Sequence, residues 1–84
     1  MTDEDRIIAG IEAKQILASP IVQAAFHAIE SQALEELIAT EIIDDVKRCR
    51  LVERVRAIRD VRGAIESIRT TGKIAASRAG AAFD

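Results

Sequence analysis

The spacing of hydrophobic residues along this chain predicts that it folds into helices. Between about residues 20 and 39, apolar residues recur every three or four positions, which places them on one face of a helix. They are Val22, Phe26, Ile29, Ala33 and Leu37. Ser19 is a favourable capping residue and Pro20 suits the first helical position, so this helix is expected to begin there.

A second hydrophobic series predicts a longer helix from about residue 46 to residue 71. Its members follow a near-heptad period, and Arg62 occupies the one position where an apolar residue is missing. Arg62 is expected to pair with a Glu from a neighbouring helix or subunit, for which Glu36 is the suggested residue. They are Leu51, Val55, Ile58, Ile65 and Ile68. Asp44 or Asp45 would cap this helix, and Gly72 would end it. Residues 73–84 are rich in Ala and Gly without a patterned face, which predicts a flexible tail.

The chain begins with a third candidate helix, over residues 3–18. Thr2 can cap it, and the acidic residues that follow suit the positive end of the helix dipole. Its isoleucines do not share one clean stripe. Residues 40–45 connect the two longer helices, as a turn or as continuous helix. Ile42 and Ile43 are unusually apolar for such a connection.

Together these elements predict a single all-α domain, with the two longer helices folded into an antiparallel hairpin after a short N-terminal helix. The expected hairpin core is Val22, Phe26, Ile29 and Leu37 against Leu51, Val55, Ile58 and Ile65. Leu34 and Ile38 lie roughly 60–100° from the main stripe. We therefore expect Leu34, Ile38 and Ile42 to contact another copy in a homo-oligomeric helical bundle.

The length of the chain also favours self-association. Eighty-four residues form one domain with a small core. Such domains are usually stabilised by disulfides, a metal or a partner subunit. One cysteine cannot form an internal disulfide, and with one histidine it offers too few ligands for structural zinc, so a partner subunit is the remaining expectation. No metal or cofactor is expected.

Charge is divided between the two halves of the chain. Residues 1–46 hold ten acidic and two basic residues, and residues 47–84 hold ten basic and four acidic residues. This complementarity favours ion pairing between helices or between copies. Contact with a polyanion is the less favoured alternative because no aromatic residue lies among the arginines to stack a base. Its candidate residues are Arg48, Arg50, Arg56, Arg59, Lys73 and Arg78.

Other residues offer little chemistry. Gly72-Lys73 fails as a phosphate-binding loop because Ser67 and Ile74 stand where that motif requires Gly and Ser or Thr. Cys49 is expected to be a small buried side chain and His27 an exposed one. No combination of nucleophile, base and pocket indicates an enzyme. No apolar run is long enough to span a membrane, and the acidic start does not resemble a signal peptide.

Two stretches carry a resemblance to a known group of proteins. One runs from Leu17-Ala18-Ser19-Pro20 through Ala25-Phe26 to Ile29-Glu30, and the other is the arginine-rich segment 61–75. Together they resemble small helical proteins encoded in the head and packaging gene clusters of tailed bacteriophages. The likeness covers roughly residues 11–75 and departs at Ile42-Ile43, where polar turn residues are expected.

The resemblance implies a role in virion assembly, in DNA packaging or as a virion component, located in the host cytoplasm or the virion. The first hypothesis is a non-enzymatic structural or assembly protein that forms a homo-oligomer and contacts other phage structural proteins. The second is a DNA-binding packaging accessory or regulator that uses the arginine-rich helix. The third is a phage inhibitor of a host protein.

Overall fold

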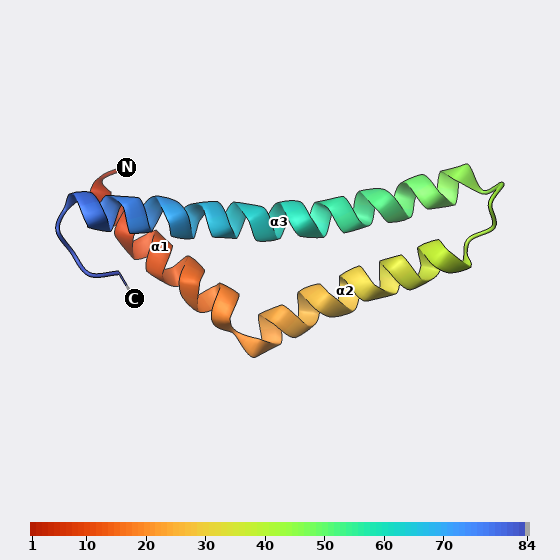
Figure 1. Ribbon diagram of the computed structural model, residues 1–84, viewed down its shortest axis with the longest axis horizontal. Helices are drawn as coiled ribbons and strands as arrows, with labels where there is room; N and C mark the ends of the chain where they lie inside the picture. Colours follow the sequence, from red (N-terminus) through yellow and green to blue (C-terminus); the bar gives the residue numbers. More distant parts are fainter. Residues whose placement is uncertain (84) are drawn as a thin grey trace.

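Three α-helices make up the fold (Figure 1), which is taken from a computed structural model that describes residues 1–83. They are α1 (Asp3–Ala18), α2 (Pro20–Ala39) and α3 (Asp45–Arg78). The all-helical class is therefore confirmed. α1 and α2 meet at a sharp bend and both lie along α3, so that the two chain ends are at the same end of the molecule (Figure 1). The Cα positions extend over 56 × 23 × 14 Å.

Local capping explains where the first two helices begin, and both have the predicted bounds. Thr2 Oγ1 accepts from the Asp5 amide at 3.1 Å, while Asp5 Oδ2 accepts from the Thr2 amide at 3.2 Å. This reciprocal pair satisfies two amides that a helix N-terminus leaves free. At the bend, the Ser19 hydroxyl accepts from the Val22 amide and Pro20 is the first residue of α2. Ser19 alone separates α1 from α2.

The connection between α2 and α3 is a turn over residues 40–44, which decides the alternative left open by the sequence. Asp44 caps α3 by accepting from the Lys47 amide at 3.1 Å.

α3 is longer than predicted, because Gly72 does not end it. Residues 73–78 continue the helix, so the prediction of a flexible tail from residue 73 is wrong for this stretch. The helix ends at Arg78, and Gly80 follows the capping residue Ala79 with a φ of +69°. The Gly80 amide donates to the Ser77 carbonyl and the Ala81 amide donates to the Ala76 carbonyl, the pairing of a Schellman motif. Asp84 lies outside the described residues.

Gly72 instead forms the closest contact between α1 and α3. It faces Gly10, and a Cβ placed on either glycine would lie 2.7 Å from the Cα of the other. Ala13, Ala75 and Ala76 are buried beside them. Small side chains therefore allow the two backbones to meet, which explains why the isoleucines of α1 form no single stripe.

Ala33, Leu51 and Val55 form the buried cluster between α2 and α3, with Leu37 packed against it. Of the remaining residues expected in the hairpin core, four are partly buried: Val22, Phe26, Ile58 and Ile65. Ile29 is exposed, contrary to the prediction. Since this region is a single layer of two helices, a side chain at the margin of the contact line has no third element to cover it.

The resulting core is shallow. No large side chain among residues 1–83 is completely buried, and four of the six buried hydrophobic residues are alanines. The accessible surface is 6117 Å². A compact monomer of 9.1 kDa is expected to expose roughly 4,900 Å². This protein therefore exposes roughly 1,200 Å² more surface to solvent than a compact monomer of the same mass would.

Candidate interaction surface

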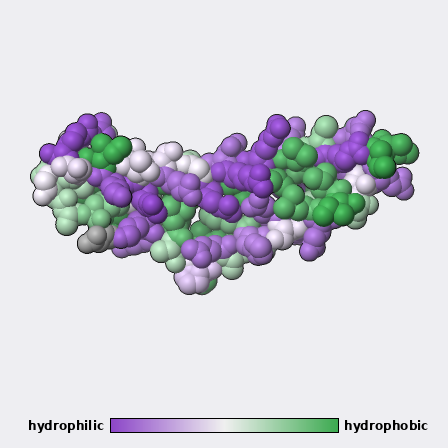
Figure 2. Space-filling model, in the orientation of Figure 1, coloured by the Kyte–Doolittle hydropathy of each residue, from purple (hydrophilic) through white to green (hydrophobic). Residues whose placement is uncertain are grey.

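Exposed hydrophobic side chains gather at the end of the molecule where α2 turns into α3. Figure 2 shows hydrophobic groups over this end and at its tip. Ile38, Ile42 and Ile43 are each 84–86% exposed, and Leu34 and Val46 are also exposed. The predicted interface residues Leu34, Ile38 and Ile42 thus lie at the surface of one end of the protein. Isolated exposed hydrophobic residues are common in proteins, but a contiguous group marks a candidate binding surface.

A groove accompanies these side chains. It has a volume of about 790 Å³ and lies between Leu37 of α2 and the first three turns of α3. Its α3 lining is Asp45, Arg48, Cys49, Val52, Glu53 and Arg56. A smaller hollow that shares Leu37, Val52 and Arg56 extends it towards Leu34. We call the residues of these two hollows the α2/α3 groove.

The α3 side of this groove was not found from the sequence. Cys49 was expected to be buried, but it is exposed. The reason is its position roughly 160° around the helix from the buried Leu51. The helical spacing could have revealed this, because Cys49, Val52 and Arg56 follow one another at intervals of three and four residues.

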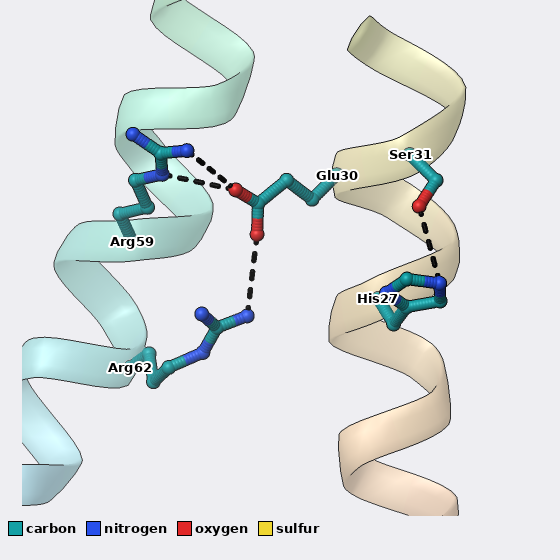
Figure 3. Close-up of polar contacts among 5 residues, drawn as sticks. All are labelled: His27, Glu30, Ser31, Arg59 and Arg62. Carbon is teal, nitrogen blue, oxygen red and sulfur yellow. Dashed lines mark hydrogen bonds and ion pairs between the residues drawn. The ribbon is translucent and has the colours of Figure 1, made fainter. Parts of the chain in front are cut away.

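Polar contacts hold α2 and α3 in register at the middle of the molecule. Glu30 of α2 accepts hydrogen bonds from Arg59, at 2.9 Å from Nε and 2.8 Å from Nη2, both to Oε1 (Figure 3). Its other oxygen, Oε2, accepts from Nη2 of Arg62 at 3.4 Å. The Arg62 guanidinium carbon also lies 5.5 Å from the centre of the Phe26 ring, within the range of a cation–π contact.

Arg62 was expected to pair with a Glu of a neighbouring helix or subunit, with Glu36 as the suggested residue. It does pair with a Glu of α2, but this residue is Glu30 and not Glu36. Glu30 lies nearer along α2, and Glu36 pairs with Arg54 at 3.8 Å. The principle behind the expectation still applies, since an arginine within the apolar stripe is neutralised by an acid on the neighbouring helix.

The two arginines lower the pKa of Glu30 below its ordinary value of 4.5. The main cause is the hydrogen bond from Arg59. The positive charges of Arg59 and Arg62 act in the same direction, whereas desolvation acts against them. A carboxylate with a lowered pKa stabilises the folded state above its unfolded pKa. That contribution is lost as the pH falls through the folded pKa.

Glu30→Gln is therefore expected to destabilise the protein at neutral pH and to have little effect in acid below the lowered pKa of Glu30, where Glu30 itself is protonated. Urea unfolding at both pH values measures the difference. Glu35→Gln is the matched control, because Glu35 is exposed on the same helix and forms no ion pair with any of residues 1–83. An equal loss of stability at both pH values would contradict the role of the ionised carboxylate.

Half of the six candidate polyanion-binding residues pair with acids of this chain. Arg48 pairs with Asp45, Arg59 with Glu30, and Arg78 with Asp3. Arg50, Arg56 and Lys73 are exposed and form no ion pair with any of residues 1–83. The structure therefore does not assemble the six into one continuous unpaired basic surface.

His27 is exposed, as expected, and its Nε2 lies 3.4 Å from the Ser31 hydroxyl (Figure 3). Within residues 1–83, no three His, Cys, Asp or Glu side chains are grouped closely enough to hold a metal ion. The helices over the same residues include none with the length and hydropathy needed to cross a membrane.

Comparison with known proteins adds no relative. No family model matches the chain, and no curated protein or solved structure is detectably similar to it.

Proposed function

We propose that this protein is a non-enzymatic structural or assembly component that acts through helix-mediated self-association and contacts with other proteins. The main supporting observation is the imbalance between a shallow core and an extensive apolar surface. Among residues 1–83, thirteen large hydrophobic side chains are exposed, while no large side chain is completely buried. A second protein surface would remove such side chains from water, which is the main favourable contribution to association.

The amount of exposed surface fits this proposal. A standard interface buries about 800 Å² on each partner. The roughly 1,200 Å² exposed beyond the expectation for a compact monomer is enough for one such contact. A homo-oligomeric bundle of helical hairpins would provide it without a disulfide or a metal.

The setting that we propose is a tailed bacteriophage, in the virion or in the host cytoplasm during particle assembly. This part of the proposal depends on the resemblance of residues 11–75 to small proteins of head and packaging gene clusters. An assembly role agrees with it, because subunits of a particle are stabilised by their neighbours.

The mass in solution tests the proposal. We expect light scattering at micromolar concentration to give a multiple of the 9.1 kDa chain mass. Ile38→Lys should shift the protein towards the monomer, because Ile38 is 85% exposed at the end of the molecule where exposed hydrophobic side chains gather. Ile21→Lys is the matched control on the same helix, at 82% exposure but far from the turn. A folded wild-type monomer throughout this concentration range would overturn the proposal.

A further inference from the structure

We infer that the α2/α3 groove is the surface on which a second copy of this chain docks, as a two-fold symmetric contact. This inference rests on the proposed self-association and assigns it a place and a symmetry. The apolar part of the contact is Leu34 and Leu37 of α2 with Val52 of α3, bordered by the exposed Cys49.

The charges of the groove favour a copy of the same chain over a nucleic acid or a strongly charged protein. Its lining holds two acids, Asp45 and Glu53, and three bases, Arg48, Arg56 and Arg59. The charge of Arg59 is already balanced by its ion pair with Glu30, which leaves two acids against two bases. A balanced set of charges is complementary to itself, whereas a polyanion requires a basic surface. In a two-fold contact the same patch meets itself, so each acid of one copy can face a base of the other.

Glu53 and Arg56 are the two charges available for such pairing. Asp45 and Arg48 already pair with each other within the chain. Neither Glu53 nor Arg56 forms an ion pair with any other member of residues 1–83, although both line the groove. We therefore place Glu53 of each copy opposite Arg56 of the other. The two helices then make two equivalent ion pairs around the apolar centre.

The shape of the molecule leaves room for this arrangement. α2 and α3 form a single layer, and the Cα positions extend only 14 Å in the thinnest direction. Two such layers placed face to face make a four-helix bundle, in which the groove residues become the core. Val52 and Leu37, which are only partly buried in one chain, would then be covered.

Charge reversal distinguishes this contact from any other mode of self-association. Glu53→Arg and Arg56→Glu, each alone, place like charges opposite one another twice, and we expect each to weaken self-association about five-fold or more. The double variant Glu53→Arg/Arg56→Glu restores both pairs and should recover wild-type affinity. A mixture of the two single variants should form mixed dimers preferentially, which native mass spectrometry resolves if one variant carries an isotope label.

Glu66 and Arg69 provide the matched control. They have the same residue types at the same spacing on the same helix, are exposed, and do not line the groove. Glu66→Arg and Arg69→Glu are expected to leave self-association unchanged. Circular dichroism of all the variants verifies that the helices are retained, because each change is at an exposed position.

Cys49 gives an independent readout that needs no charge change. In a groove-mediated dimer its thiol is covered, so its labelling by N-ethylmaleimide should slow as the protein concentration rises through the range of self-association. If the wild-type protein self-associates while the charge variants and Cys49 labelling are unaffected, this inference is overturned and the proposed function stands. If the wild-type protein does not self-associate, both are overturned.

Discussion

Replacing Gly72 with alanine is expected to lower the free energy of unfolding by about 1–3 kcal/mol, the usual cost of inserting a group into a closely packed contact. The new Cβ would lie 2.7 Å from the backbone oxygen of Arg6 and 2.7 Å from the Cα of Gly10. Both atoms belong to the backbone of α1, so they cannot move aside as the end of a side chain would. α1 would have to shift away from α3.

Gly63 provides a control on the same helix. A Cβ at Gly63 meets no atom within 4 Å. Because alanine is a better helix former than glycine, Gly63→Ala is expected to stabilise the protein by up to about 1 kcal/mol. Thermal or urea unfolding of the two variants measures the opposite signs. Equal stability of Gly72→Ala and Gly63→Ala would contradict the close crossing of α1 and α3.

Replacing Leu51 with alanine is expected to lower the free energy of unfolding by about 2–5 kcal/mol. Leu51 is only 3% exposed and belongs to the cluster with Ala33 and Val55. The change would remove apolar contacts and leave a cavity between α2 and α3. For a domain of this size such a loss is a large fraction of the total stability, so partial unfolding at room temperature is an expected result.

Urea unfolding at one fixed protein concentration measures this effect, since self-association would add to the apparent stability. Ile74→Ala is the control, because Ile74 is 53% exposed on the same helix and its truncation should change stability by no more than about 0.5 kcal/mol. A loss at Leu51 as small as the loss at Ile74 would show that the cluster between α2 and α3 is not the core.

The bounds of α1 and α2 could be predicted from the sequence because the signals that set them are local. Thr2 and Ser19 cap their own helices because their hydroxyl oxygens accept hydrogen bonds from the amides three residues ahead. Pro20 can begin a helix without losing a hydrogen bond. None of these interactions depends on another part of the chain, so the residue order alone contains them.

The predicted end of α3 was wrong because a glycine that ends a helix and a glycine that packs against another helix look alike in a sequence. The terminator rule is correct, but it applies to Gly80, where the backbone takes a positive φ. Gly72 stays within the helix because α1 lies against it at a distance that no side chain would permit. That neighbour lies about sixty residues earlier in the chain. The spacing of residues within α3 carries no information about it, because periodicity relates only residues that are close in sequence.

The candidate surface could be predicted in part. The positions of Leu34 and Ile38 off the main stripe indicated a second exposed face on α2, and both are exposed. The groove beside them depends on the relative placement of α2 and α3, which brings Leu37 and Val52 to the lining of one hollow. The choice of Glu30 over Glu36 as partner of Arg62 depends on the same placement, because two acids six residues apart look equivalent until the register is known.

The continuity of α3 has a consequence for how the protein opens. α1 contacts the part of this helix around Gly72, and α2 contacts the part around Leu51 and Val55. The two docking zones lie about twenty residues apart on one rod, roughly 30 Å at the helical rise. Because the two zones share no residue of α3, we expect either one to separate from the rod while the other stays closed. Hydrogen exchange after Gly72→Ala would then show faster exchange near both chain ends and unchanged protection near the turn.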